Sequence, residues 1–217
     1  MFPVLKELGV VSKLCSVKTF LPTPSMLNNK IDLYLASNSP RRKKMLHSLG
    51  INFKQLAIEH EEIISANETP LKNVKRLAKE KCEKAFQKLN KGIIISADTI
   101  VVFEGKIIGK PTSKKNAIQI LKQLSGKTHI VYTGYAVGDA STKIARLGYE
   151  KTRVTFYQLS KEQIEEYVAS GSPMDKAGAY GIQDDYGSLF VKKINGCYNN
   201  VVGFPIAKIF RTLEMIT

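Results

Sequence analysis

The 217-residue sequence has few cysteines, no long apolar run and no repeated or low-complexity segment. No stretch approaches the roughly 18 consecutive apolar residues of a membrane-spanning helix, so we expect a soluble protein without a membrane partner. The cysteines are odd in number and widely spaced, and no two form a Cys-x-x-Cys pair. This pattern argues against a disulfide framework and a zinc cluster, and it favours a reducing, cytoplasmic compartment.

Acidic residues are also scarce: 19 Asp and Glu stand against 33 Lys and Arg, which leaves a net charge of +14. This balance indicates an anionic partner, and nucleic acid, a membrane surface and a small polyphosphate are the alternatives. Aromatic residues do not alternate with the basic ones, and there is no zinc-finger spacing or RNA-recognition signature. Nucleic acid is therefore the weaker choice, and most lysines of residues 72–91 are expected to form the wet face of a helix.

The first 29 residues differ in pattern from the rest of the chain. Their mildly apolar stretch is interrupted by lysines and followed by Pro22 and Pro24, so we expect no secretory signal. A basic organelle presequence is an alternative, which Glu7 and the absence of arginine weaken, and a translation start at Met26 is another. We expect residues 1–29 to be a poorly ordered or artefactual extension and residues 30–217 to form one domain.

From residue 32 onward, strand and helix patterns alternate along the chain. Apolar, β-branched runs indicate strands at residues 32–36, 51–58, 93–103, 106–109, 128–137, 146–156 and 189–194. Amphipathic spacing and end signals indicate helices at residues 40–49, 71–89, 113–124, 160–169 and 205–215. The polar turn around Asp139 joins two strands into a hairpin, which interrupts the alternation. These patterns predict an α/β fold with a mixed β-sheet and flanking helices.

Residues 35–44 place a strand end, a small polar turn and an arginine pair at the start of a helix. Ser39 is a suitable N-cap, and Pro40 suits the first helical position. Backbone N–H groups, the positive end of the helix dipole, the serine hydroxyls and the guanidinium groups of Arg41 and Arg42 would converge on an anion there. From this segment alone, ordinary helix capping with a solvated basic face is an equal alternative.

Asp98 interrupts the apolar, β-branched run of residues 93–102. An unpaired carboxylate among residues suited to burial is costly, so Asp98 is expected to have a partner. A buried ion pair or a hydrogen-bonded aspartate at a strand break would explain it structurally. A metal ligand or general base at the rim of a cleft is the functional alternative, which we favour because Lys110-Pro111 and the polar turn at residues 37–42 also follow strands.

Four separated motifs resemble those of the Maf family, in the family's order, and the resemblance spans residue 31 to the C-terminus. They are Ala36-Ser37-Asn38-Ser39-Pro40-Arg41-Arg42, Ala97-Asp98-Thr99-Ile100-Val101-Val102 with Gly109-Lys110-Pro111, Leu124-Ser125-Gly126-Lys127-Thr128-His129 with Tyr132-Thr133-Gly134, and Met174-Asp175-Lys176-Ala177-Gly178-Ala179-Tyr180-Gly181-Ile182-Gln183. Four ordered motifs are far more specific than any one of them.

The resemblance implies a nucleoside triphosphate pyrophosphatase, which hydrolyses a nucleoside triphosphate to the monophosphate and diphosphate with a divalent metal cation. Mg²⁺ is the expected cation, with Mn²⁺ and Co²⁺ as alternatives. The implied fold is similar to that of inosine triphosphatase-like (Maf/Ham1) proteins, with two lobes around a central cleft, and the implied assembly is a homodimer. The motifs resemble those of the branch that acts on dTTP and UTP, with modified pyrimidine nucleotides as related substrates.

By motif matching, the resemblance assigns catalytic roles to Asp98, Glu62 and Lys81, and it makes Glu62 and Asp98 the metal ligands. Glu61 is a rival for Glu62. Attack on a phosphoanhydride needs charge neutralisation and a carboxylate that orients or deprotonates water, and the assigned residues supply both. The residues assigned to the triphosphate and the rest of the substrate pocket are Ser37, Ser39, Arg41, Arg42, Lys81, Lys110, Gln183, Asp175 and Lys176.

One departure from the family's pattern is Gln183-Asp184-Asp185-Tyr186-Gly187, because the family usually continues with glycine directly after the glutamine. Two extra acids near the pocket leave the nucleobase open, with 7-methyl-GTP as an alternative substrate. An alternative from another class is a non-catalytic regulator of cell division that binds protein or nucleic acid, which the retention of Asp98, Lys110 and Gln183 argues against. The histidines pair with no nucleophile motif and are interpreted as structural or surface residues: His47, His60 and His129.

Overall fold

The computed structural model describes residues 31–216, and the expected extension at residues 1–29 lies outside the described residues. The strands are β1 (Leu33–Leu35), β2 (Lys54–Gln55), β3 (Ile93–Phe103), β4 (Lys106–Ile108), β5 (Thr128–Asp139), β6 (Ile144–Phe156) and β7 (Val191–Asn195). The helices are α2 (Pro40–Ser48), α3 (Pro70–Phe86), α4 (Lys114–Leu124), α5 (Lys161–Ala169), α6 (Asp185–Ser188), α7 (Tyr198–Val202) and α8 (Ile206–Glu214), with two 3₁₀ turns, η1 (Ser172–Asp175) and η2 (Ala177–Ala179).

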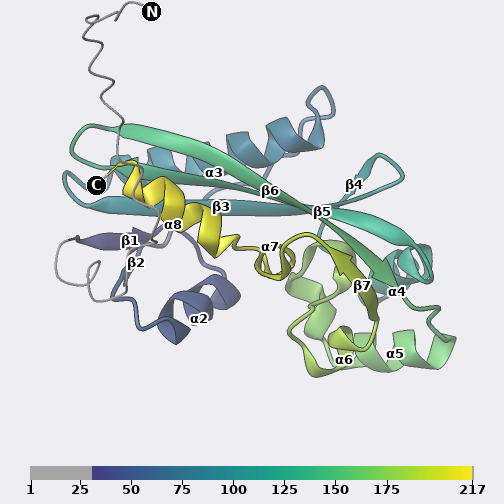
Figure 1. Ribbon diagram of the computed structural model, residues 1–217. Coiled ribbons are helices and arrows are strands. Elements are labelled where there is room, and N and C mark those ends of the chain that lie inside the picture. Colours follow the sequence, from purple (N-terminus) through teal and green to yellow (C-terminus); the bar gives the residue numbers. More distant parts are fainter. Residues whose placement is uncertain (1–30, 217) are drawn as a thin grey trace, which may run out of the picture.

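The seven strands form one mixed sheet in the order β2-β1-β3-β5-β6-β7, with β4 paired to β3 (Figure 1). β1 pairs in parallel with β2 and β3, and the remaining pairs are antiparallel. The predicted α/β class, mixed sheet and β5–β6 hairpin are therefore confirmed. Within residues 31–216, no helix has the length and apolarity needed to cross a bilayer.

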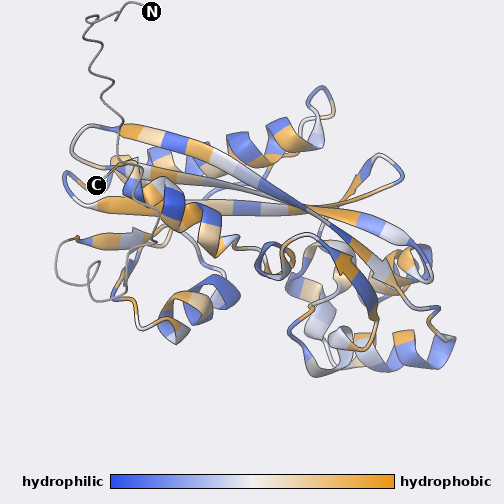
Figure 2. Ribbon diagram, viewed as in Figure 1, coloured by the Kyte–Doolittle hydropathy of each residue, from blue (hydrophilic) through white to orange (hydrophobic). Residues whose placement is uncertain are grey.

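Helices cover both faces of the long strands. On β5, Gly134 lies against the backbone of Val74 in α3, whereas the neighbouring Tyr135 places its hydroxyl 3.2 Å from Thr212 Oγ1 in α8. Successive side chains of a strand point to opposite faces, so α3 and α8 lie on opposite sides of the sheet. The largest apolar cluster lies on the α8 side and includes side chains of α2, α4 and α5. The helices show the mixed hydrophobic and hydrophilic colouring of amphipathic elements (Figure 2).

Two predicted elements are shorter than the sequence indicates. The strand expected at 51–58 is reduced to Lys54–Gln55, because Ile51 and Ile58 are buried in core clusters without pairing in the sheet. Their apolar pattern indicates burial rather than strand pairing. The helix expected to reach residue 89 ends at Phe86, where Lys143 Nζ donates to the carbonyl oxygens of Phe86 and Leu89 at 2.6 Å each.

The outer edge of β3 is paired only at its two ends. Residues 93–95 pair with β1, and residues 101–103 pair with β4. Among the described strands, none pairs with this edge between residues 96 and 100, although the opposite edge pairs with β5 throughout. The sheet therefore has a gap beside Asp98, where β1 and β4 flank an unpaired stretch of the β3 edge.

Two glycines of β5 let α3 approach the sheet closely. A Cβ at Gly134 would lie 2.3 Å from the carbonyl oxygen of Val74, and a Cβ at Gly138 would lie 2.6 Å from the ring of Phe86 and 2.7 Å from Cys82 Sγ. Gly134 is also the residue opposite Asp98 on the neighbouring strand. Opposite residues of an antiparallel pair share a face, so Asp98 projects toward α3.

Replacement of Gly134 by alanine tests this close packing. The added methyl group meets backbone atoms that cannot rotate away, so we expect Gly134→Ala to lower the free energy of unfolding by about 1–3 kcal/mol. Gly109→Ala is the matched control, because no heavy atom lies within 4 Å of a Cβ at that position. Chemical denaturation measures both variants. An equal, small effect of the two changes would contradict the close approach of α3.

Candidate active site

A cleft with a volume of about 450 Å³ lies at the gap in the sheet. Every residue to which the family resemblance assigns a role lines it: Ser37, Ser39, Arg41, Arg42, Glu62, Lys81, Asp98, Lys110, Asp175, Lys176 and Gln183. Glu61, the rival of Glu62, lines a neighbouring groove instead. The fold thus brings together residues that lie up to 146 positions apart in the sequence, from Ser37 to Gln183.

The loop after β1 leads directly into α2, as the sequence predicts. Ser39 occupies the N-cap position and Pro40 is the first helical residue, but the Ser39 side chain makes no capping hydrogen bond. Instead, the Ser39 N–H group donates to Ser37 Oγ at 3.3 Å. Ser37 therefore holds the turn, and the helix N-terminus, where the dipole and backbone N–H groups favour an anion, faces the cleft.

Arg42 is buried and joins the loop to the gap in the sheet. Its Nε donates to Gly203 O at 2.8 Å, and its Nη2 donates to Thr99 Oγ1 at 3.1 Å. Its Nη1 donates to Ser37 Oγ and to Ala97 O, each at 2.9 Å. Burial lowers the pKa of Arg42 from its usual value. A guanidinium group has five N–H donors, and four of those of Arg42 are engaged by the protein. Arg42 therefore mainly connects parts of the protein, and one donor remains for a ligand.

Arg41 contacts the opposite wall of the cleft. Its Nη1 donates to Asp175 Oδ2 at 2.8 Å, and the side chains are 26% and 55% exposed. Asp175 belongs to η1, so this ion pair links α2 to a segment 134 residues further along the chain. An exposed ion pair of this kind is weak and can exchange its partners. The loop before α2 is therefore connected to the far wall.

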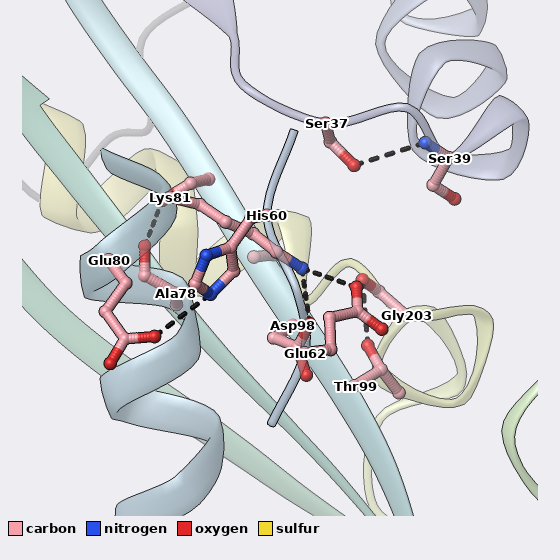
Figure 3. A network of polar contacts seen from close by, with 12 residues as sticks. Ser37, Ser39, His60, Glu62, Ala78, Glu80, Lys81, Asp98, Thr99 and Gly203 are labelled. Atoms are coloured by element: carbon pink, nitrogen blue, oxygen red, sulfur yellow. Dashed lines mark hydrogen bonds and ion pairs between the residues drawn. The ribbon is translucent and has the colours of Figure 1, made fainter. Parts of the chain in front are cut away.

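Lys81 is the centre of a cluster of four charged side chains, which are Lys81, Glu62, Asp98 and Lys110, and Figure 3 shows the first three of them. Its Nζ lies 2.5 Å from Asp98 Oδ1 and 2.7 Å from Glu62 Oε1, and its side chain is only 9% exposed. The other oxygen of Glu62 lies 3.0 Å from Lys110 Nζ, which is more exposed. The expected partner of Asp98 is thus Lys81, and the structural alternative, a buried ion pair, is confirmed. The pair lies in the cleft, and a functional role for Asp98 stays a prediction.

The pKa values of the two carboxyl groups of this cluster are shifted in opposite directions. Burial acts to raise the pKa of Glu62, but the charges and hydrogen bonds of Lys81 and Lys110 outweigh it and lower that pKa to about 2. Burial raises the pKa of Asp98, and Lys81 offsets this effect only in part. Glu62 is consequently suited to remain an anion, whereas Asp98 is suited to accept a proton.

The far wall of the cleft is held by Asp184, one of the two acids that depart from the family's pattern. Asp184 Oδ2 accepts hydrogen bonds from Ser172 Oγ at 2.5 Å and from Tyr167 OH at 3.0 Å. It also lies 3.2 Å from Lys176 Nζ, which contacts Asp175 Oδ1 at 2.7 Å. Asp184 does not line the cleft, and it fixes Lys176 from behind.

Thr99, Gly203 and His60 are among the lining residues that the sequence analysis did not assign to the site. Thr99 accepts from Arg42, and its position directly after Asp98 in a motif is the signal that could have found it. Gly203 ends α7 in a left-handed conformation, with φ of 102°, and a glycine after a short helix is a recognisable signal. His60 has no sequence signal. Its Nε2 lies 2.9 Å from Glu80 Oε2 (Figure 3), at an angle unsuited to a hydrogen bond.

Among residues 31–216, no group of three or more His, Cys, Asp and Glu side chains is placed to hold a metal ion. Glu62 and Asp98 are thus two carboxylates without a third acidic or histidine ligand. The described cysteines, Cys82 and Cys197, are both free thiols.

The fold is similar to that of the Ham1 protein of Staphylococcus aureus, with a TM-score of 0.50 and 14% sequence identity. The similarity covers 86% of this chain and 100% of that protein, and it shows a shared mixed-sheet fold. The predicted similarity to inosine triphosphatase-like proteins is confirmed at the level of the fold.

Residues 32–216 match the Maf-like protein family, and the chain belongs to that family. A protein of Carboxydothermus hydrogenoformans named dTTP/UTP pyrophosphatase is 45% identical over 183 residues, which cover 84% of this chain and 97% of that protein. A Bacillus pumilus protein of the same name is 48% identical over 183 residues, which cover 84% of this chain and 95% of that protein. The similarity therefore spans nearly the whole of these relatives.

The buried His129, which contacts a residue of the cleft wall, is expected to make the stability of the protein depend on pH. His129 Nε2 lies 2.8 Å from the hydroxyl of Tyr180, a lining residue, and burial lowers the pKa of His129 to about 4. As the pH falls from about 6.5 to 4, the unfolded chain binds a proton that the folded protein does not, so stability is lost across this window. Between pH 7 and pH 5 we expect this residue to contribute a loss of about 2 kcal/mol.

Denaturation of His129→Gln at the two pH values measures this contribution, because the variant lacks the titrating group. Its stability should fall less between pH 7 and pH 5 than that of the unchanged protein. His47→Gln, which replaces an exposed histidine, is the control and should keep the full pH dependence. Identical slopes for all three proteins would exclude His129 as the cause.

Proposed function

We propose that this chain is a nucleoside triphosphate pyrophosphatase that hydrolyses dTTP and UTP to the nucleoside monophosphate and diphosphate. The observation that carries the proposal is the Lys81 cluster, which lies in one cleft with the loop at residues 37–42. An anion-binding loop, lysines and two carboxylates of different acidity are what hydrolysis of a phosphoanhydride requires. Membership of the Maf family and the names of the relatives support the same activity.

The triphosphate is proposed to bind between the loop and the lysines. Ser37 and Ser39 lie at the N-terminus of α2, where a phosphate group is favoured. Arg41 and Lys110 are partly exposed and carry charges that phosphate oxygens can take over from Asp175 and Glu62. Arg42, with its remaining donor, keeps the loop in register with β3.

The donor chemistry of the cleft fits a divalent cation that enters with the substrate. Mg²⁺ is commonly held by one or two carboxylates together with substrate phosphates, and Glu62 and Asp98 would supply those carboxylates. The absence of a third acidic or histidine ligand among the described residues agrees with a cation whose other ligands are phosphate oxygens and water. When bound, such a cation neutralises negative charge on the phosphates. Mg²⁺ is our first choice, with Mn²⁺ and Co²⁺ as alternatives.

Asp98 is proposed as the general base. A water molecule forms the new bond to the α-phosphorus and gives its proton to the Asp98 carboxylate. The bond between the α-phosphorus and the bridging oxygen of the β-phosphate breaks, and diphosphate leaves with that oxygen. Lys110 and Arg41 stabilise the negative charge of the departing diphosphate.

The nucleobase is proposed to lie toward the wall formed by residues 175–183. Lys176 and Gln183 line this part of the cleft and offer hydrogen-bond donors to a pyrimidine. Asp184 binds Lys176 and does not line the cleft, so this acid of the departing segment does not contact the nucleobase site. The family resemblance supports pyrimidine triphosphates over 7-methyl-GTP. A homodimer and a cytoplasmic location are part of the proposal on the strength of the family resemblance.

Release of diphosphate from a panel of nucleotides tests the proposal. With Mg²⁺ we expect turnover of dTTP and UTP and much lower turnover of 7-methyl-GTP, with monophosphate and diphosphate as products. Asp98→Asn should lower kcat by about 10²–10⁴-fold, because the general base is lost. Asp32→Asn, which changes an exposed aspartate outside the cleft, is the control and should keep the activity.

Two outcomes would contradict this assignment. Full activity of Asp98→Asn would exclude Asp98 as the base. A folded protein that hydrolyses no nucleotide but binds DNA with a steep salt dependence would favour a non-catalytic regulator over the enzyme.

Asp184→Asn tests the role of the far wall. The amide can keep the contacts with Ser172 and Tyr167, but it loses the charge beside Lys176. We expect KM for UTP to rise about three- to tenfold with little change in kcat, because binding of the nucleobase is disturbed while the Lys81 cluster is intact. Asp139→Asn, on a distant turn, is the control for steady-state kinetics. A fall in kcat with unchanged KM would place Asp184 in the chemical step and overturn this interpretation.

A further inference from the structure

The most unusual feature of the cleft is that one buried ammonium group contacts both carboxylates of the Lys81 cluster. Lys81 Nζ lies within 2.7 Å of an oxygen of Glu62 and 2.5 Å of an oxygen of Asp98. Glu62 comes from the loop before α3, and Asp98 comes from β3. A single small cation is thus already placed between the two oxygens, and Figure 3 shows the ammonium group with a contact to each.

A divalent cation that bridges Glu62 and Asp98 at this point would need the same two oxygens. An ammonium group and a metal ion cannot both occupy the position between them, since each is a compact positive charge that requires the same lone pairs. A metal ion bound in this position would therefore require Lys81 to leave. The lysine side chain has a flexible four-carbon stem, so its ammonium group can move without displacement of α3.

The charges of the cluster balance without any metal ion. Glu62 and Asp98 carry two negative charges when ionised, and Lys81 and Lys110 carry two positive ones. A divalent cation on its own would add two positive charges to a largely buried site, which is costly. The phosphates of a nucleotide offer the displaced ammonium groups new anionic partners, and entry of both together restores the balance.

We propose that Lys81 is an internal placeholder for the divalent cation: its ammonium group occupies the position between Glu62 and Asp98 until a metal ion and a triphosphate enter together, and it then transfers to the phosphate oxygens. This inference rests on the proposed function, which supplies the reason for a divalent cation. It follows that the metal ion alone binds weakly and that metal and nucleotide strengthen each other's binding by the same factor.

Binding of Mn²⁺ in the absence of nucleotide tests the placeholder directly. Isothermal titration calorimetry, or the loss of the free-ion signal in electron paramagnetic resonance, gives the affinity of the full chain. We expect weak binding by the unchanged protein and at least tenfold tighter binding by Lys81→Met, because the competing cation is removed while both carboxylates remain. Lys81→Arg keeps a positive charge and should remain a weak binder. In Lys81→Met with Asp98→Asn, the gain should disappear, which locates it at this site.

Lys110→Met is the matched control. It removes the same charge from the same cluster, but Lys110 contacts only Glu62 and does not bridge the two carboxylates. If the gain came from overall charge alone, both lysine variants would bind Mn²⁺ equally well, and the proposal would be wrong. Equally weak binding by folded Lys81→Met and the unchanged protein would also overturn it.

A second measurement needs no variant. Thermal unfolding of the unchanged protein should shift little with Mn²⁺ alone, and Mn²⁺ with a non-hydrolysable dTTP analogue should give a shift larger than the sum of the separate shifts. Tight binding of Mn²⁺ without nucleotide would exclude the placeholder even if Lys81→Met does not fold. Because the metal titrations need no turnover, the proposed activity can fail in the diphosphate assay while the exchange of Lys81 for Mn²⁺ is still observed, and the reverse result is equally distinguishable.

Discussion

The cleft depends on the interrupted pairing of β3. This strand is bound along one edge to β5, but its other edge is open between residues 96 and 100, where β1 has ended and β4 has not begun. A buried strand with an open edge leaves backbone carbonyl groups that need donors. Arg42 supplies one of them to Ala97 O and holds the loop at residues 37–42 at the same point. The break in the sheet thereby positions both the carboxylate of Asp98 and the loop that faces it.

The close packing of α3 against the sheet brings charged side chains together beside this gap. Because Gly134 removes a side chain opposite Asp98, the helix lies low enough on the sheet for Lys81 to reach the carboxylate. A buried lysine and a buried aspartate are each costly alone and tolerable as a pair. The ammonium group also binds the carboxylate of Glu62, which connects the loop before α3 to this pair.

The sequence allows local features to be predicted better than long-range ones. The strand end, turn and helix around Ser39 follow from cap and proline preferences, and Asp98 is conspicuous because a charge interrupts an apolar run. The partners of Arg42 could not be predicted, because Gly203 lies 161 residues away and its carbonyl has no side-chain signal. The orientation of the Asp184 side chain could not be predicted from the sequence either. An acid next to a pocket motif suggests a pocket residue, but its contacts with Tyr167 of α5 and Ser172 of η1 depend on how these elements pack.

The high net charge of the chain does not leave unpaired cations in the part of the cleft proposed for the triphosphate. Arg41 is paired with Asp175, Lys110 with Glu62, and Lys81 with two carboxylates. Binding of a triphosphate would exchange these partners rather than satisfy free charges, so the net gain depends on what replaces the cations at the carboxylates. A metal ion that arrives with the nucleotide provides that replacement, whereas a bare anion does not. Under the proposed function, the site would therefore discriminate for the metal complex of a nucleotide, while the remaining positive charge of the chain would attract it from a distance.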